Sequence, residues 1–476
     1  MTWAGATALD IATAVRRNDA TAEAVLHDHL DHYKRRPDDC VHNLRHEAAS
    51  IEAQLIDTLD SSADTGTSNG STELFPEIPV PVPEPDRSAL PTAGVPVITC
   101  QQLPLAGQAS QLGSNATFIE SPDRDHEAIR RFKGTGAVMI ATTRSSELGL
   151  WPATDQPGQV LRNPHHPEHS PGGPSGGAAA ALALGLAPLA IGLDGPATAG
   201  GVRTAAASCG LFAYSPETEV TATDQPSPVW YVHKPGLMAT TAADLVLGVS
   251  TLTNRDYSAR EEPRPLRIAA STSTPMPGKA DEDNTASLLQ AVRALTDAGH
   301  RTLRAKADWG RRLPTVSSAV WATAAFHRSR HFRALQRRTR HLASLGATLH
   351  RQNRIAGLLG QGERARRHIE DWFSVNNVDL LITPALPSGP AAARSWSEAT
   401  LRANVNGLVS SAAFTAPAGV TGLPAVVVPV GSRHDGLPSS VQLIGPPGST
   451  SRLLAVASQL SDVFQPRRHA RSVIWE

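Results

Sequence analysis

The stretch that decides the fold is residues 170–210, SPGGPSGGAAAALALGLAPLAIGLDGPATAGGVRTAAASCG. Its first loop contains glycines that allow a backbone which a Cβ atom would block: Gly172, Gly173, Gly176 and Gly177. The small residues at 178–186 predict a helix whose N-terminal amides face this loop. The apolar run at 188–193 predicts a buried strand, and a second glycine turn follows at Gly200-Gly201.

This stretch closely resembles the glycine-serine motif of the amidase signature family, whose members hydrolyse amides with a Ser-Ser-Lys triad. In that family the loop reads Gly-Gly-Ser-Ser-Gly-Gly, and a later Gly-Thr-Asp-x-Gly-Gly-Ser-x-Arg segment carries the nucleophilic serine. The first loop serine, held in a cis peptide, relays the proton, and an upstream lysine is the base. Segments 414–429 and 440–447 match as well, so the resemblance covers roughly residues 1–60 and 94–465.

The resemblance implies the amidase signature fold, a single large α/β domain whose mixed, mainly parallel sheet is flanked by helices. Continuous apolar runs at 137–141, 188–193, 378–383 and 425–430 fit parallel strands that are buried on both faces. Residues 94–141 add a predicted strand-helix-strand unit, which is expected to be parallel.

We divide the chain into three parts. Residues 1–60 predict an N-terminal helical segment of two helices, with Thr21 as N-cap of the second. Residues 61–93, rich in Ser and Pro, predict a flexible surface loop, although a proline-motif ligand for another protein is an alternative. Residues 94–476 form the amidase-like domain. Within it, 255–375 is the variable helical region that walls the pocket in relatives, and its arginines are expected on a solvated helix face.

Composition narrows the classes of function. The 44 Lys+Arg balance 44 Asp+Glu, and this neutral total argues against nucleic-acid or membrane-surface binding. No segment reads as a signal peptide or a membrane span. The 3 cysteines are too few and too dispersed for a disulfide framework or a zinc site, which favours a reduced, cytoplasmic chain. The sequence predicts no cofactor, and the resemblance suggests a homodimer.

The histidine-rich run His165-His166-Pro167-Glu168-His169 invites a metal-binding interpretation. It falls where the family has an ordinary loop, and adjacent histidines point apart in most conformations. We therefore predict no metal site there.

Two of the three triad positions carry residues that cannot do the family's chemistry. The lysine position falls on Cys100, and a neutral thiol cannot replace a neutral amine as proton acceptor. A thiolate could act as base or nucleophile, but it needs a cationic neighbour. The relay serine position falls on Pro174, which has no hydroxyl but tolerates a cis peptide. The loop's second serine, Ser175, is expected to hydrogen-bond the glycine turn.

The nucleophile position has two candidates because of a three-residue insertion. Counting back from Arg203 places Gly201 there, whereas counting forward from Asp194 places Thr198 there. Pro196 lacks an N–H and disturbs the turn that would form the oxyanion hole. Asp194 and Arg203 survive, and in relatives such residues brace the loop.

Three hypotheses of function follow. The first is a non-hydrolytic amidase homologue, a pseudoamidase that keeps a pocket for a small amide or acyl ligand or supports a partner protein. The second is a divergent amidase, acyltransferase or cyclase that uses Cys100, Ser175 or Thr198. The third is a structural or interaction protein. Retention of the motif glycines favours the first two, and loss of all three triad residues favours the first.

Overall fold

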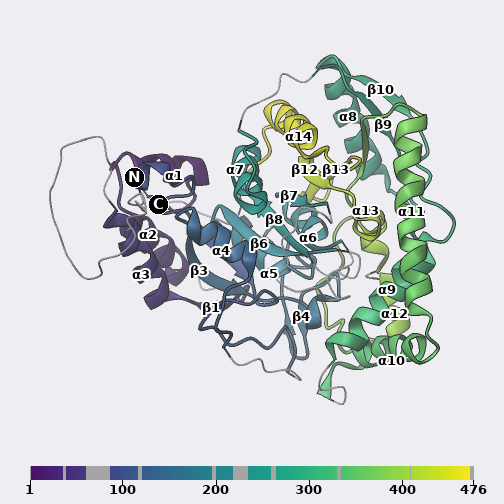
Figure 1. Ribbon diagram of the computed structural model, residues 1–476, viewed down its shortest axis with the longest axis horizontal. Coiled ribbons are helices and arrows are strands. Elements are labelled where there is room, and N and C mark those ends of the chain that lie inside the picture. The colour runs from purple at the N-terminus through teal and green to yellow at the C-terminus, as the bar shows by residue number, and fades with distance from the viewer. Residues whose placement is uncertain are drawn as a thin grey trace, which may run out of the picture.

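The computed structural model describes residues 2–35, 39–59, 86–115, 121–195, 200–217, 234–258, 264–329, 334–407 and 409–471. These residues form one α/β domain around a large mixed sheet, with helices on both faces (Figure 1). The predicted fold class is confirmed. Thr198 and most of the predicted 61–93 loop lie outside the described residues.

The main sheet has the strand order β1-β3-β2-β6-β8-β7-β12-β13-β11-β9-β10, and β4 and β5 form a separate pair. The strands are β1 (Val41–Leu44), β2 (Pro96–Cys100), β3 (Val138–Thr143), β4 (Asp155–Gln156), β5 (Gln159–Val160), β6 (Leu189–Asp194), β7 (Phe212–Ser215), β8 (Lys234–Ala239), β9 (Arg267–Ala270), β10 (Arg301–Arg304), β11 (Leu380–Pro384), β12 (Ala425–Ser432) and β13 (Pro438–Ile444).

The parallel neighbours form two groups within this sheet. Strands β3, β2 and β6 run parallel at one side, and β11, β9 and β10 run parallel at the other. The strands between these groups pair antiparallel. The apolar run at 425–430 was expected to be a strand with parallel neighbours, and this expectation is wrong. Strand β12 is antiparallel to both neighbours, and it is apolar because α14 (Thr450–Phe464) and α6 (Gly201–Cys209) pack against it.

The remaining helices are α1 (Ala8–Arg16), α2 (Ala22–Arg35), α3 (His46–Asp57), α4 (Glu127–Gly134), α5 (Gly176–Ala183), α7 (Ala242–Thr253), α8 (Glu282–Asp297), α9 (Leu313–Arg328), α10 (Arg337–Arg351), α11 (Ile355–Val375), α12 (Leu401–Gly407) and α13 (Ala416–Thr421). The predicted β2-α4-β3 unit is present and parallel. The N-terminal segment holds three helices and the edge strand β1, rather than the two helices expected. Thr21 does cap α2, since its Oγ1 accepts from Ala24 N at 3.1 Å.

Glycines show how the helices are divided between the two faces of the sheet. On β8, a Cβ at Gly236 would lie 2.6 Å from Val202 of α6, whereas the next side chain, Leu237, contacts Gly248 of α7. Because successive strand residues point to opposite faces, α6 and α7 cover opposite faces. Helix α5 lies on the α6 face, since a Cβ at Gly192 of β6 would meet both Ser175 and Val202.

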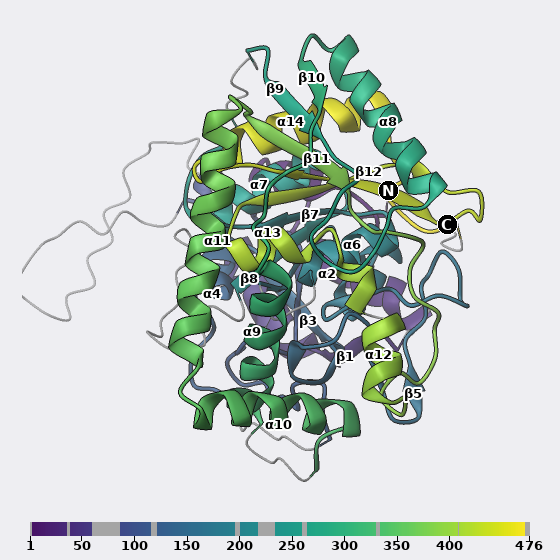
Figure 2. The same cartoon turned by 90° about the vertical axis from the view of Figure 1, so that its right-hand side faces the viewer.

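Within residues 255–375, helices α9, α10 and α11 form a layer along the side of the molecule opposite α1–α3 (Figures 1 and 2). The same stretch also contains α8 and the sheet strands β9 and β10, so it is not helical throughout as expected. The expectation that its arginines lie on a solvated face is wrong for Arg338. This side chain is fully buried, and its Nη2 donates to Asp155 Oδ1 at 2.9 Å. Its guanidinium also lies 4.7 Å from the centre of the Trp151 ring. Arg338 therefore anchors the helical layer to the loop that precedes the glycine motif.

Candidate functional site

The residues that the sequence predicts at and beside the triad positions lie close together at the carboxyl ends of β2 and β6. Cys100 is the last residue of β2, and β2 runs parallel to β6. From the glycine loop, the Ser175 hydroxyl accepts a hydrogen bond from Leu193 N of β6 at 3.0 Å and also interacts with the Cys100 thiol. Gly201 packs on the same strand, against the Leu193 carbonyl. Residues from four separate segments thus converge where β2 and β6 end.

The glycine loop is held closely against its surroundings. The Gly173–Pro174 peptide is cis, and the Pro174 carbonyl accepts from Ser146 N at 3.1 Å. At Gly177 a Cβ would collide with the Arg144 carbonyl and lie 2.8 Å from Arg144 N. The backbone therefore needs glycine at 177 for packing, whatever chemistry the loop performs.

Ser175 has a different partner from the one expected. Its hydroxyl bonds strand β6, through Leu193 N, instead of the glycine turn. The side chain is completely buried at the N-cap of α5. This bond fixes the loop to the strand, so Ser175 couples the two segments that meet at the site.

Cys100 lies in an environment that keeps its thiol protonated. The side chain is fully buried, and burial raises the pKa of the thiol to about 11. The backbone N–H groups of Gln102 and Leu103, the Ser175 hydroxyl and the charge of Arg328 oppose this shift without cancelling it. A neutral thiol is neither a strong nucleophile nor a proton acceptor at neutral pH.

Gly201 leaves no room for a side chain. It begins α6 with φ of +52°, and a Cβ there would collide with the Leu193 carbonyl and lie 2.5 Å from Asp194 Cα. The preceding Gly200 also has a left-handed backbone, with φ of +89°. In this geometry, position 201 cannot present a hydroxyl to a ligand.

Asp194 and Arg203 form a fully buried ion pair beneath this turn. Arg203 Nε and Nη2 donate to the two Asp194 carboxylate oxygens at 3.1 and 2.9 Å. Arg203 Nη1 donates to the Thr415 carbonyl at 2.6 Å and to Gln442 Oε1 at 2.7 Å. Through these bonds the pair ties the end of β6 to α6, to the residue before α13 and to β13.

The sequence did not single out two cations that lie near this edge. Lys234 of β8 faces Asp194 in register, is buried, and donates to the Pro216 carbonyl. Burial lowers the pKa of Lys234 to about 7, and Asp194 opposes that shift. Arg328, at the end of α9, donates to Gln102 Oε1 at 2.7 Å. No local pattern marks Arg328, because its partner lies far away in the sequence.

The histidine run is held by backbone carbonyls. His165 Nε2 bonds the Cys209 carbonyl at 2.9 Å, and His169 Nδ1 bonds the Pro390 carbonyl at 2.8 Å. Among the described residues, no group of His, Cys, Asp and Glu side chains is arranged to hold a metal ion. The described helices likewise include none that is long and apolar enough to cross a membrane.

A cavity of about 190 Å³ is lined in part by α9 and α10. Its wall is mainly apolar and comes from the helical layer and the C-terminal segments, including Trp321, Leu342, Leu401, Val405 and Ala416. Thr415, next to Ala416, bonds Thr204 of α6 at 3.1 Å between hydroxyl oxygens. Ala416 thus links the cavity wall along the chain to Thr415, but Cys100, Gly201 and Arg328 do not line this cavity.

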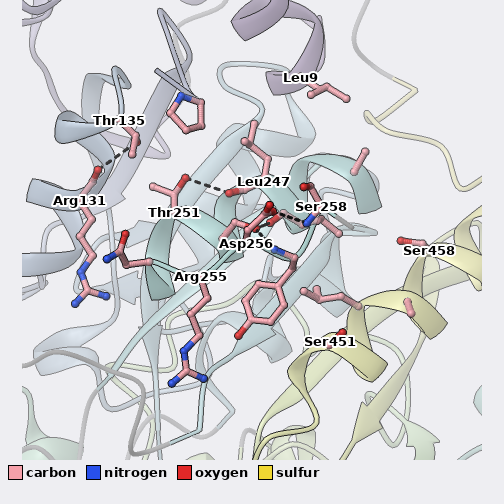
Figure 3. A pocket seen from close by; sticks show the side chains of 18 of the residues that line it. Leu9, Arg131, Thr135, Leu247, Thr251, Arg255, Asp256, Ser258, Ser451 and Ser458 are labelled. Carbon is pink, nitrogen blue, oxygen red and sulfur yellow. Dashed lines mark hydrogen bonds between the residues drawn. The ribbon is translucent and has the colours of Figure 1, made fainter. Parts of the chain in front are cut away.

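A second cavity, of about 740 Å³, lies away from the site (Figure 3). Its lining side chains come from α1, α4, α7 and α14, including Leu9, Arg131, Leu247 and Ser458. The residues that line it do not include Cys100 or Gly201. We do not assign this cavity to the triad-equivalent site.

Comparisons with known proteins agree with this architecture. A family model described as Amidase matches residues 83–454. The chain is 32% identical to "Putative amidase AmiB2" of Mycobacterium tuberculosis over 400 residues, which are 80% of this chain and 84% of that protein. It is 27% identical to one of the subunits of the glutamyl-tRNA(Gln) amidotransferase of Thermus thermophilus, covering 81% of this chain and 88% of that one. The solved structure of 6-aminohexanoate cyclic dimer hydrolase superposes with a TM-score of 0.82 at 22% identity, covering 97% of both chains.

The geometry at Gly201 predicts that a serine introduced at this position destabilises the protein. Gly201→Ser should lower the free energy of unfolding by about 2 kcal/mol or more, because the new Cβ meets backbone atoms at a left-handed φ. Urea unfolding measures this change. Gly357→Ser, in open space on α11, is the matched control and should change stability by less than about 0.5 kcal/mol. A Gly201→Ser protein as stable as the wild type would contradict this geometry.

The environment of Cys100 predicts slow alkylation. At pH 7.5 a thiol with a pKa of about 11 is almost wholly protonated, and its burial also blocks the reagent. Iodoacetamide should label Cys100 at least about 100-fold more slowly in the native protein than in urea. Mass spectrometry of the Cys100 peptide follows both rates. Equal rates would show an activated, accessible thiol.

Proposed function

Because the chain belongs to the amidase family, we propose that it is a non-hydrolytic member that binds a small amide or acyl ligand. The proposal rests on the predicted substitution of all three triad residues. Cys100 and Pro174 take the predicted positions of base and relay, and Gly201 or Thr198 takes that of the nucleophile. The protonated thiol, the proline and the glycine cannot attack a carbonyl or transfer its proton at neutral pH, and a Thr198 hydroxyl would have no lysine or relay serine to activate it.

The neighbouring cavity supports the binding part of the proposal. Its size and its mainly apolar wall suit an acyl chain or a small aromatic group. Trp321, which lines it, is held in place because its Nε1 donates to the Leu150 carbonyl at 2.9 Å. A pocket with a fixed wall is ordered before the ligand arrives, which lowers the entropic cost of binding.

The alternative is a divergent enzyme that uses Cys100, Ser175 or Thr198. The Ser175 hydroxyl is buried and already accepts from Leu193 N, and the Cys100 thiol is protonated. Both observations argue against activation of these groups. Thr198 lies outside the described residues, so it is the residue on which this alternative now depends.

A protein partner is the second candidate function. The observation that favours it is the similarity to a relative that is named as part of a multi-subunit amidotransferase. Homodimer formation and a cytoplasmic location are further proposals, the latter consistent with the three buried cysteines, which form no disulfide. Static light scattering of the purified chain distinguishes monomer from dimer.

Hydrolysis of a panel of simple amides and esters tests the proposal. We expect turnover no faster than the uncatalysed rate, since Cys100, Pro174 and Gly201 supply neither a base nor a nucleophile at neutral pH. Thr198→Ala, Ser175→Ala and Cys100→Ala are assayed beside the wild type. Turnover by the wild type that disappears in one of these variants would overturn the proposal and identify the nucleophile.

Ligand binding is measured on the same panel by thermal shift. Ser318→Trp, on the rim of the apolar cavity, should block binding because the indole fills the space. Thr315→Trp is the control, because it lies on the same helix and is exposed but does not line the cavity. Equal effects of the two substitutions would contradict the assignment of this pocket.

A further inference from the structure

Arg328 brings a positive charge to the segment that follows Cys100. It extends from the last turn of α9, and its Nη2 donates to Gln102 Oε1 at 2.7 Å. Gln102 is two residues beyond Cys100, and its Nε2 is held by Ser145 Oγ at 2.7 Å. The charge of Arg328 interacts with the Cys100 thiol. The guanidinium is thus held by Gln102, an amide that is itself fixed by Ser145.

The charge of Arg328 lacks a counter-ion within the described chain. The carboxylates that the structure describes include none in an ion pair with it, and Gln102 is neutral. Its Nε is buried and has no hydrogen-bond partner among the described residues. Arg338 provides the contrast, since its charge is matched by Asp155. An unmatched, half-buried cation is costly unless an anion binds to it.

The role of Arg328 is not to activate the Cys100 thiol. Burial raises the pKa of the Cys100 thiol to about 11 even with Arg328 nearby, so the thiol stays neutral. Arg328 cannot serve as a base either, because its pKa, lowered by burial to about 10, keeps it protonated at neutral pH. The charge is therefore available for a ligand.

We propose that Arg328, positioned by Gln102, binds the carboxylate of a small acid ligand, so that the site recognises carboxylic acids in preference to the corresponding amides. This inference rests on the proposed function and deepens it by naming the ligand class. A carboxylate offers two oxygens to adjacent guanidinium N–H groups, and such charge-assisted pairs are stronger than neutral ones. A primary amide presents its own N–H donors to the same cation and gains less.

Helix α9 also carries Trp321, whose position suggests the chemistry of the remainder of the ligand. Trp321 lies seven residues before Arg328, which is two helical turns and about 10 Å along one face of α9. Trp321 lines the apolar cavity, whereas Arg328 does not. An acid with an apolar tail of medium length matches this spacing, with its carboxylate at Arg328 and its tail toward Trp321.

Binding of matched acid and amide pairs tests the inference. Acetate, hexanoate and octanoate are titrated into the full-length protein by calorimetry, beside acetamide, hexanamide and octanamide. We expect hexanoate or octanoate to bind at least about tenfold more tightly than its amide, as charge-assisted hydrogen bonds allow. Arg328→Gln should abolish this preference, and Arg328→Lys should retain part of it. Arg337→Gln, an exposed arginine on α10, is the matched control and should retain the preference.

The outcomes separate this inference from the proposed function. Equal affinity for acid and amide, no binding of any acid, or an acid preference that survives in folded Arg328→Gln protein would each overturn the inference. Amide binding without hydrolysis in those cases leaves the proposed function intact. Conversion of the amides to acids during the titration would overturn the proposed function instead. Circular dichroism of each variant confirms that a lost preference is not lost folding, and Arg328→Lys provides the second test.

Discussion

The buried ion pair between Asp194 and Arg203 is the interaction on which the site's architecture depends. Both side chains are completely inaccessible to solvent, and the arginine also bonds Thr415 and Gln442. Removing one member of such a pair leaves an uncompensated charge in the interior, at a cost of about 3–5 kcal/mol. This constraint accounts for the presence of both residues without any role in catalysis. They hold β6, α6 and β13 together whether or not a reaction occurs nearby.

The residues that keep the shape of the site are thus different from the residues expected to carry out a reaction. The glycine loop keeps residues whose packing leaves no space for a Cβ, and its serine bonds the adjacent strand. In our proposal, the side chains at the positions of proton transfer and attack perform neither step. Helix α9 contributes Arg328 to the segment after Cys100, and it also lines an apolar cavity. We therefore propose a receptor for a small ligand rather than a hydrolytic centre.

Local patterns predicted the elements that lie near one another in sequence. Strand β2, the parallel β2-α4-β3 unit and the Thr21 cap were predicted because each depends on a few neighbouring residues. Strand β1 was missed because it is a four-residue edge strand without an apolar alternation. The antiparallel setting of β12 was missed because burial on both faces gives the same apolar run in either direction.

The candidate site was predicted in part for a similar reason. Motif spacing identified the residues at the strand ends, but it could not identify their contacts. The roles of Arg338 and Arg328 depend on partners that are 183 and 226 residues away, and both arginines occur in a region where most charged residues are exposed. The predicted hydrogen-bond partner of Ser175 was wrong because only the folded chain places Leu193 N beside the Ser175 hydroxyl.

The central claim is that the chain has no activated hydroxyl nucleophile, and a covalent probe tests it without knowledge of the substrate. The intact protein is incubated with a fluorophosphonate, which modifies activated serine and threonine hydroxyls, and its mass is measured. The account predicts no adduct, as for the same protein after heat denaturation. An adduct on Thr198 or Ser175 that is lost in the corresponding alanine variant would contradict it and identify an activated hydroxyl nucleophile.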